Sequence, residues 1–211
     1  MLPDKNEWIK ALEERHGKAL QDRISQATVA ICGLGGLGSN IAVLLARIGI
    51  GKLILIDFDK VEITNLHRQQ YKAAQIGMYK TEALACNLKE IAPYLETKIH
   101  TIRMAKENYP VLLQSADIIV EAFDRPEEKA NLVNFVLSEM PEKYIVAASG
   151  MAGIDSANLI KTRRVSKRFY LCGDEKSDVK DGMGLVASRV SVCASHQAHV
   201  VLRIIAEKFD V

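Results

Sequence analysis

Residues 28–38 read Thr-Val-Ala-Ile-Cys-Gly-Leu-Gly-Gly-Leu-Gly, and this stretch decides the fold. Its first half, 28–32, is a short apolar run with β-branched residues, which predicts a buried strand. Its second half contains a G-x-G-x-x-G pattern made by Gly33, Gly35 and Gly38, with a further glycine at Gly36. An apolar helical pattern over 39–48 follows. Strand, glycine turn and helix in this order predict a backbone that can approach a phosphate at the start of the helix.

Strands and helices alternate along the rest of the chain. Apolar runs predict further strands over 52–57, 98–104, 116–122 and 143–148, and helical spacing predicts helices over 80–91, 127–139 and 185–208. Nearly continuous apolar strands separated by helices predict an α/β fold, a Rossmann-like mainly parallel sheet with helices on both faces. Beyond Gly150 the pattern changes, and we expect an antiparallel C-terminal extension.

We expect a single domain over 1–211, with an N-terminal helical segment over 4–26. Gly17 is the expected break in this segment. Because 161–181 is polar and rich in charge, we expect a mobile loop there.

Composition excludes several classes of protein. The chain has 211 residues with 28 Lys and Arg against 26 Asp and Glu, a net charge of +2, so it has no basic footprint for nucleic acid. No two of its four cysteines form a C-x-x-C pair, and no zinc is predicted. No signal peptide and no uninterrupted run of about 18 apolar residues is found, so we expect a cytoplasmic protein with no membrane partner.

An acidic residue, Asp57, follows the second predicted strand, 19 positions after Gly38. In dinucleotide-binding folds such a carboxylate binds ribose hydroxyls. The glycine turn and Asp57 alone are compatible with an NAD-binding oxidoreductase or sensor, or with a partner-binding module that has no catalytic activity. However, more polar and charged residues follow than a nicotinamide site needs, namely Asp59, Asn65, Arg68, Gln69 and Lys80. Two cations and amides favour a triphosphate, and therefore ATP.

Taken together, these motifs resemble the ThiF/MoeB/HesA superfamily, relatives of the ubiquitin-activating enzymes. The matching stretches are Gly33-x-Gly35-Gly36-Leu37-Gly38, Asp57-x-Asp59-x-Val61, Asn65-Leu66-x-Arg68-Gln69, Gly77-x-x-Lys80 and the region of Asp124. The chain looks most similar to the short ThiF-like sulfur carrier protein adenylyltransferases. The resemblance implies that Gly36 approaches the nucleotide, Asp57 binds the ribose, and Asn65, Arg68 and Lys80 hold the phosphates.

The same resemblance implies an activity and its partners. Such an enzyme uses ATP and Mg²⁺ to adenylate the C-terminal carboxylate of a small ubiquitin-like carrier protein ending in Gly-Gly. The products are an acyl-adenylate and pyrophosphate, within thiamine thiazole synthesis or a related sulfur-transfer pathway. A sulfur-donor protein and a homodimer are also implied, and the apolar helix over 185–208 favours a dimer. Lys10 and Arg15 are the nearest candidates for a basic residue that acts across the dimer.

Asp124 is the expected Mg²⁺ ligand. Mg²⁺ prefers one or two carboxylates together with phosphate oxygens, and Asp124 follows a strand at its carboxyl end. An alternative role for Asp124 is the N-cap of the helix whose first turn contains Pro126. Arg125 stands where the family has an asparagine.

Two further features leave alternatives open. Cys172 could trap the activated carrier, with basic neighbours lowering its pKa, or be an inert buried thiol like the expected core residues Cys32, Cys86 and Cys193. His196 and His199 lie one helical turn apart, a spacing that favours helix packing over metal binding when no third ligand is apparent.

Overall fold

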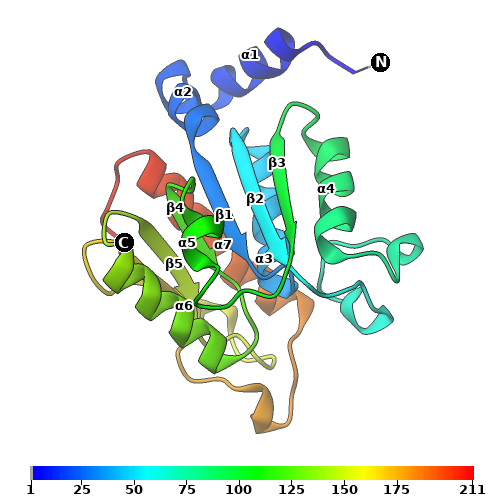
Figure 1. Ribbon diagram of the computed structural model, residues 1–211, viewed down its shortest axis with the longest axis vertical. Coiled ribbons are helices and arrows are strands. Elements are labelled where there is room, and N and C mark those ends of the chain that lie inside the picture. Colours follow the sequence, from blue (N-terminus) through cyan, green and yellow to red (C-terminus); the bar gives the residue numbers. More distant parts are fainter. Residues whose placement is uncertain (1) are drawn as a thin grey trace.

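The computed structural model describes residues 2–211 and contains a seven-stranded sheet (Figure 1). The strand order is β3-β2-β1-β4-β5-β7-β6. All neighbouring strands are parallel except β6 and β7, which are antiparallel. The strands are β1 Thr28–Cys32, β2 Lys52–Asp57, β3 Glu96–Thr101, β4 Ile118–Glu121, β5 Tyr144–Ala148, β6 Lys161–Arg164 and β7 Phe169–Gly173. The predicted Rossmann-like fold with an antiparallel C-terminal extension is therefore confirmed.

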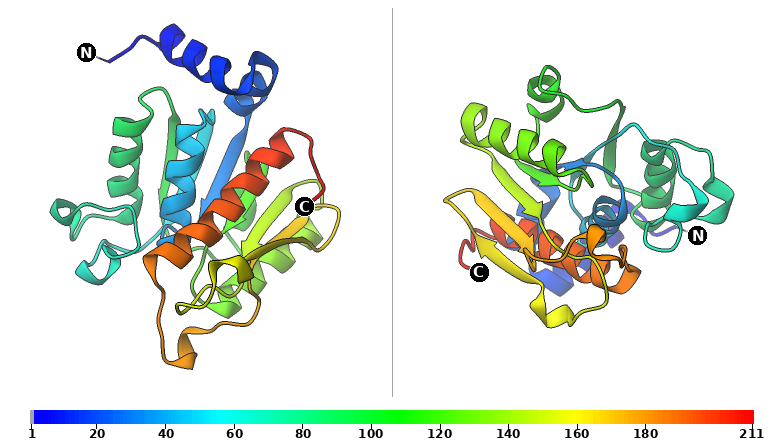
Figure 2. Two further views of the ribbon diagram at one scale, coloured as in Figure 1. Left: turned by 180° about the vertical axis from the view of Figure 1, so that it is seen from behind. Right: turned by 90° about the horizontal axis from the view of Figure 1, so that it is seen from below.

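Helices cover both faces of the sheet (Figure 2). They are α1 Lys5–His16, α2 Lys18–Gln26, α3 Gly36–Arg47, α4 Lys80–Ile91, α5 Tyr109–Leu113, α6 Pro126–Glu139 and α7 Ala187–Ile205. Short 3₁₀ turns are η1 Ile63–Asn65, η2 Ala73–Gln75, η3 Ala157–Leu159 and η4 Val179–Asp181.

The alternation of side chains along the strands divides the core into two layers. Ile31 of β1 and Leu55 of β2 belong to the larger cluster, which contains buried residues of α3, α4 and α7. Ala30 and Ile54, their neighbours in sequence, belong to a second cluster formed with α5 and α6. Since strand residues on both faces are buried, nearly continuous apolar strands are what this architecture requires.

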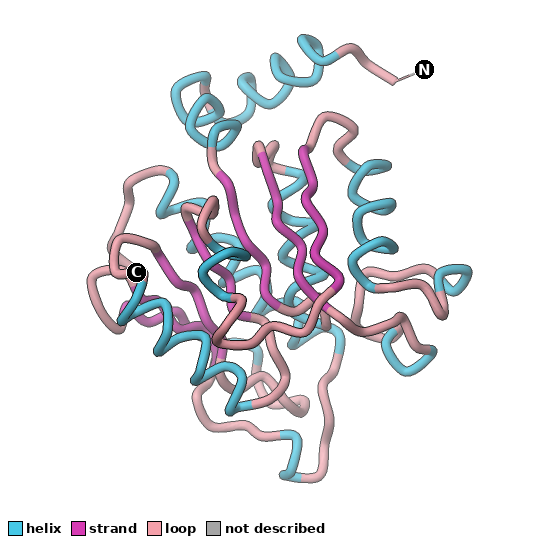
Figure 3. The backbone as a smooth tube through the Cα atoms, viewed as in Figure 1, coloured by secondary structure: helices cyan, strands magenta, loops and turns pink. Residues whose placement is uncertain are grey.

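The N-terminal helices α1 and α2 lie beyond the amino ends of the central strands (Figures 1 and 3). Asp4 caps α1 by accepting hydrogen bonds from Asn6 N and Glu7 N, and Gly17 separates the two helices at a φ of +82°. This matches the predicted helical segment and its break. The helix α1, which carries Lys10 and Arg15, therefore lies at the opposite end of the sheet from the glycine turn.

Several predicted elements need correction. The third strand spans 96–101 instead of 98–104, and the short helix α5 was not predicted. The segment 161–181, predicted to be a mobile loop, contains the strands β6 and β7. β6 is an edge strand whose charged residues face solvent, so its sequence lacks the apolar signal of a buried strand.

One prediction about packing is also wrong, because Cys86 is exposed on α4 although it was expected in the core. The helix α7, whose apolar character favoured a dimer, packs along α3 and the sheet. It buries Val190, Cys193, Ala194, Ala198, Val200, Val201 and Ile204, while Val192, Leu202 and Ile205 are partly buried.

The strand order reverses at the position where open α/β folds bind ligands. From β1 the chain moves outward to β2 and β3, then returns to the other side of β1 with β4 and β5. The carboxyl ends of β1 and β4 therefore diverge into oppositely directed connections, at the point where doubly wound sheets bind nucleotides. The glycine turn follows β1 and Asp124 follows β4 at this edge.

Candidate functional site

The glycine turn is shaped by close backbone contacts. Gly33 has a φ of +92°, and a Cβ atom added there would lie 2.8 Å from the carbonyl oxygen of Ala122. A Cβ on Gly38 would lie 1.9 Å from the carbonyl oxygen of Gly33, which only glycine avoids. The helix α3 begins at Gly36, and its N-cap Gly35 provides no side-chain cap. The first amides of α3 therefore lack a side-chain acceptor, as an anion site at a helix N-terminus requires.

Two side chains close over Gly36. A Cβ atom on this glycine would lie 3.0 Å from Val190 Cγ1 of α7 and 3.5 Å from Arg68 Cγ. Asn40 of α3 donates from its side-chain amide to the carbonyl oxygens of Gly36 (2.6 Å) and Arg68 (3.1 Å). The polar segment that carries Arg68 is therefore attached directly to the glycine turn.

Asp57 joins the end of β2 to the glycine turn. Its Oδ2 accepts a hydrogen bond from Leu34 N at 2.6 Å, and its Oδ1 accepts one from Asp59 N at 2.8 Å. The carboxylate is buried, and this burial raises its pKa, although the nearby charge of Lys80 opposes the shift. Each carboxylate oxygen has a second lone pair that can accept a ribose hydroxyl.

Lys80 and Asp59 form an ion pair next to Asp57. Lys80 Nζ lies 2.8 Å from Asp59 Oδ2, and Lys80 N donates to the carbonyl oxygen of Asp59 at 2.9 Å. The Lys80 side chain is 8% exposed, whereas that of Asp59 is 49% exposed. A buried ammonium with a single carboxylate at its tip has further N–H donors for an anion.

The segment 65–69 presents three of the predicted side chains. Asn65 Oδ1 accepts a hydrogen bond from the amide of Glu62, the N-cap of η1, and Arg68 Nη1 donates to the carbonyl oxygen of Thr64 at 3.0 Å. Gln69 is buried beside Gly35, and Gln69 Oε1 and Arg68 Nε are buried atoms without a hydrogen-bond partner. Unsatisfied buried polar atoms at one place are typical of a site that a ligand completes.

Asp124 lies on the loop between β4 and α6, and its side chain is exposed. Burial lowers the pKa of Arg68, and the negative charge of Asp124 opposes this shift, so the two groups lie within electrostatic reach of each other. The N-cap of α6 is Arg125, without a side-chain cap, and Pro126 is the first helical residue. The alternative role of Asp124 as the N-cap of α6 is therefore wrong, and its carboxylate does not cap this helix.

The carboxylates of the site decide whether it can bind Mg²⁺. No group of three or more His, Cys, Asp or Glu side chains within residues 2–211 is arranged to hold a metal ion. Mg²⁺ bound with a nucleotide needs only one or two carboxylates, because phosphates and waters supply the remaining oxygens. The Asp124 carboxylate fits that requirement, since it lies within electrostatic reach of Arg68 and directly follows Phe123, which lies against Gly33.

Several residues that support the site were not predicted from the sequence. Tyr71 donates from its hydroxyl to the carbonyl oxygen of Leu34 at 2.7 Å, and is buried. The ring nitrogens of His67 lie 2.9 Å from the carbonyl oxygen of Thr64 and 3.1 Å from that of Leu185. Glu121 of β4 is fully buried and paired with Lys129. The contacts of Tyr71 with Leu34 and of His67 with Leu185 join segments far apart in sequence, so no local pattern indicates them.

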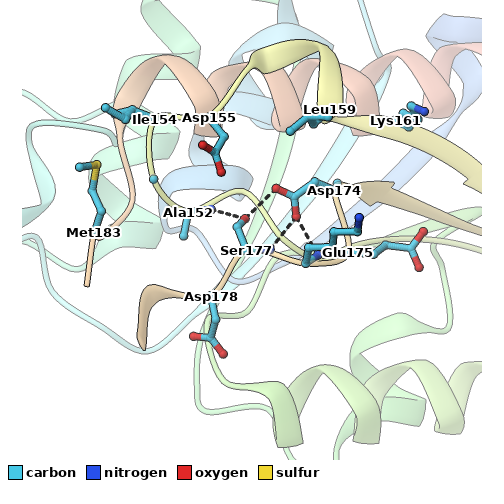
Figure 4. Close-up of a pocket in the computed structure, with 13 residues that line it drawn as sticks. Ala152, Ile154, Asp155, Leu159, Lys161, Asp174, Glu175, Ser177, Asp178 and Met183 are labelled. Carbon is cyan, nitrogen blue, oxygen red and sulfur yellow. Dashed lines mark hydrogen bonds between the residues drawn. The ribbon is translucent and has the colours of Figure 1, made fainter. Parts of the chain in front are cut away.

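A pocket of about 550 Å³ opens beside the carboxyl ends of β5 and β7 (Figure 4). Asp174 forms one wall, where it accepts hydrogen bonds from Ser177 and pairs with Arg189 of α7 at 2.6 Å. Exposed apolar side chains on its rim are Ile154, Leu159 and Met183. Because Arg189 immediately precedes Val190, this wall is connected through α7 to the glycine turn.

Cys172 lies inside the molecule and not on a loop. It belongs to β7, is fully buried, and has its pKa raised to about 11 by burial. The contact that opposes this shift is with Thr162, at 3.6 Å, and not with a basic side chain. The thiol therefore lacks the exposure and the lowered pKa of a reactive cysteine.

The two histidines of α7 have different surroundings. His196 Nδ1 lies 2.9 Å from Thr162 Oγ1, and burial lowers the pKa of His196, with a smaller contribution from His199. His199 is exposed. The contact between α7 and β6 agrees with the packing role for His196, but not for the exposed His199.

The fold is a Rossmann-like sheet with a glycine turn and cations at the carboxyl end of β1, an arrangement typical of nucleotide-binding proteins. The model of the ThiF family matches residues 10–210, and the chain belongs to this family.

Individual relatives agree with that membership. Over 83 residues the chain is 45% identical to a Caenorhabditis elegans protein named ubiquitin-like modifier-activating enzyme 5, covering 39% of this chain and 20% of that protein. Over 144 residues it is 31% identical to the adenylyltransferase and sulfurtransferase UBA4 of Candida glabrata, covering 66% and 32%. The chain thus spans only about a fifth to a third of these two curated relatives.

The fold is shared with a solved structure over nearly its full length. The Escherichia coli tRNA N6-threonylcarbamoyladenosine dehydratase TcdA, solved in complex with ATP, matches with a TM-score of 0.86 at 19% identity. The match covers 99% of this chain and 98% of that one. Finally, none of the helices within residues 2–211 has the length and apolar character needed to cross a membrane.

Proposed function

We propose that this chain is an ATP-dependent adenylyltransferase that activates the C-terminal carboxylate of a small ubiquitin-like carrier protein ending in Gly-Gly. The observation that carries the proposal is the convergence of Arg68, Gln69 and the Lys80–Asp59 pair on a glycine turn, in a member of the ThiF family. An NAD site would leave both cations without a task. Relatives named as enzymes that activate ubiquitin-like modifiers support the choice of carrier.

Adenylation requires that the carrier carboxylate and the α-phosphate are aligned and that the negative charge of the phosphates is neutralised. A general base is not needed. An α-carboxyl group has a pKa of about 3.5, so it is ionised at neutral pH and can attack directly. One carboxylate oxygen forms a bond to the α-phosphorus while the bond from that phosphorus to the bridging oxygen of the β-phosphate breaks. Pyrophosphate leaves with the bonding electrons, and the acyl-adenylate remains.

Each site residue receives a role in this reaction. Asp57 would bind the ribose hydroxyls, and the backbone at Gly36 would approach the phosphates. Asn65, Arg68 and Lys80 would stabilise the negative charge that develops on the transferring and departing phosphates. Asp59 would orient Lys80, and Gln69 would donate to the nucleotide beside Gly35. Mg²⁺, when bound with Asp124 and the nucleotide, would neutralise phosphate charge.

We propose that the carrier tail reaches the nucleotide past the pocket beside β5 and β7. The pocket is linked to the glycine turn through α7, because Arg189 pairs with Asp174 in the pocket wall and Val190 lies against Gly36. Its apolar rim suits an extended peptide. We also propose a cytoplasmic homodimer that works with a sulfur-donor protein in thiamine thiazole synthesis or a related sulfur-transfer pathway. Similarity to the ThiF-like adenylyltransferases supports this setting.

Carrier-dependent exchange of labelled pyrophosphate into ATP tests the proposed function. We expect exchange with a carrier that ends in a free Gly-Gly carboxylate, and none with the same carrier amidated at its C-terminus. Binding of NAD in place of ATP would favour the oxidoreductase or sensor. Tight carrier binding without exchange would favour a partner-binding module that has no catalytic activity.

A further inference from the structure

A buried ion pair lies directly under the loop that carries Asp124. Glu121, the last residue of β4, is fully buried, and both its carboxylate oxygens lie 3.0 Å from Lys129 Nζ of α6. Lys129 Nζ also donates to the carbonyl oxygen of Ala148, at 3.1 Å on β5. The three donors of the ammonium are thus matched by three acceptors from two neighbouring strands.

The carboxylate of Glu121 also holds the backbone that follows it. Its Oε1 accepts a hydrogen bond from Phe123 N at 2.7 Å, two residues along the chain. On the other side, Ala122 N donates to the carbonyl oxygen of Cys32 at 2.9 Å. Both amides between β4 and Asp124 are therefore anchored, one to β1 and one to the buried carboxylate.

The anchored segment also touches the glycine turn. A Cβ atom on Gly33 would lie 2.8 Å from the carbonyl oxygen of Ala122 and 3.2 Å from Phe123 Cδ1. Any shift of residues 122–123 would therefore move the glycine turn or the loop at Asp124. Asp124 in turn lies within electrostatic reach of Arg68.

A contribution to the stability of the fold does not by itself explain the Glu121–Lys129 ion pair. Buried ion pairs can often be replaced by apolar side chains of similar volume without loss of stability, because desolvation offsets their attraction. What an apolar replacement cannot supply is an acceptor for Phe123 N. The hydrogen bond from Phe123 N therefore distinguishes a role of Glu121 in positioning the backbone from a role in stability.

We infer that Glu121, held by Lys129, is a positioning residue that sets the Phe123–Asp124 backbone for the magnesium nucleotide. The inference rests on the proposed function for the identity of the nucleotide. Glu121 itself does not reach the reacting atoms, because it is fully buried.

A matched pair of double variants tests this role. Glu121→Gln with Lys129→Met removes both charges but keeps an acceptor for Phe123 N, whereas Glu121→Met with Lys129→Met removes the acceptor as well. We expect the first variant to bind ATP in Mg²⁺ about as the wild type does. For the second we expect a loss of about tenfold or more, as is common when a group that orients a ligand-binding residue is removed.

Two readouts do not depend on catalysis. Amide hydrogen exchange of Phe123, followed by NMR, should be slow in the wild type and in the Gln variant, and faster in the Met variant. Thermal unfolding should remain cooperative in both. Lys52→Met with Glu96→Met, a pair at the amino ends of β2 and β3, is a control for loss of an ion pair and should change neither readout.

Equal nucleotide affinity and equal Phe123 protection in the Gln and Met variants would overturn the inference. Equal losses in both variants would overturn it too, because the charges and not the acceptor would then matter. If the Met variant fails to fold, the single variant Glu121→Gln tests the inference instead. A tenfold loss of ATP affinity in that folded variant, which keeps the acceptor, would contradict an acceptor role. Absence of pyrophosphate exchange in the wild type would instead count against the proposed function and leave the Phe123 readout intact.

Discussion

Lys80 Nζ lies 2.8 Å from Asp59 Oδ2, with the lysine almost fully buried and the aspartate half exposed. The pair places a positive charge near Asp57, which contacts the glycine turn, while the carboxylate of Asp59 stays accessible to water. We expect Lys80→Met to lower the rate of pyrophosphate exchange about a hundredfold, the scale seen when an electrostatic contact to a transition state is removed. ATP affinity should fall less. Lys60 follows Asp59 in the chain and is exposed, so Lys60→Met is the matched control.

Steady-state kinetics and ATP titration separate these effects. A tenfold loss of affinity with unchanged turnover would show that Lys80 binds ground state and transition state equally, contrary to its proposed role.

Asp124→Asn should abolish exchange and leave the melting temperature nearly unchanged. The side chain is exposed and does not cap α6, so its removal costs little stability, while a carboxylate suited to Mg²⁺ is lost. Exchange assays over a Mg²⁺ series, together with thermal unfolding, check both parts. Near wild-type exchange in Asp124→Asn would remove Asp124 from the site.

Gly36→Ala should weaken ATP binding through a clash with α7. The added methyl would lie 3.0 Å from Val190 Cγ1, and a side chain, unlike backbone, can be shortened to relieve it. We therefore expect Val190→Ala to restore part of the lost affinity in the double variant, measured by calorimetry. Gly38→Ala is the contrast, since its methyl would meet the backbone oxygen of Gly33 and no single substitution can relieve that. Lack of any rescue by Val190→Ala would mean that the affinity is lost for another reason.

Cys172→Ser should leave pyrophosphate exchange intact. Because burial raises the pKa of Cys172 to about 11, its reactive thiolate would become abundant only as the pH rises toward that value. Mass spectrometry after treatment with iodoacetamide at neutral pH should find Cys86 modified and Cys172 untouched. A carrier adduct on Cys172 in a reaction quenched without reductant would contradict this expectation.

Asp174→Asn should destabilise the fold by about 3 kcal/mol, since it leaves the buried guanidinium of Arg189 without its carboxylate. Burial alone would raise the pKa of Asp174, but hydrogen bonds from Ser177, Lys176 and Arg189 lower it from 3.8 to about 2. Because the pKa of Asp174 is lower in the folded state than in the unfolded state, its ionised carboxylate stabilises the fold at pH values above the unfolded-state pKa. This contribution disappears as the pH falls through the folded-state pKa.

Urea unfolding across a pH series checks this prediction. The difference in free energy of unfolding between wild type and Asp174→Asn should be full above about pH 4 and shrink toward pH 2. Asp155→Asn, an exposed carboxylate in the same pocket, serves as the control. A difference that stays constant down to pH 2 would show that the charge of Asp174 is not what stabilises the pair.

Local patterns sufficed for the centre of the fold. The strand at 28–32, its glycine turn and Asp57 are contiguous signals, and Asp57 and Leu34 are indeed joined at 2.6 Å. β6 was missed because an edge strand needs no apolar alternation. β7 was missed because charged residues surround it in sequence, although Tyr170 and Cys172 are buried.

Within the site, residue types were easier to predict than partners. The cations Arg68 and Lys80 were identified, but the pairing of Lys80 with Asp59 depends on a fold that brings positions 21 apart in sequence together. Glu121 was expected only as part of the strand over 116–122. Its contact with Lys129 and its hydrogen bond from Phe123 N arise where β4 turns into α6, and no spacing rule reveals them.

The two open edges of the sheet carry charged side chains. β6 presents Lys161, Arg163 and Arg164 to solvent, and β3, at the other edge, presents Glu96 and Lys98. If two copies paired along β6, rows of like charge would face each other, which disfavours a continuous sheet across molecules and resists fibrous aggregation. A dimer of this protein would therefore not form by adding strand to strand at β6.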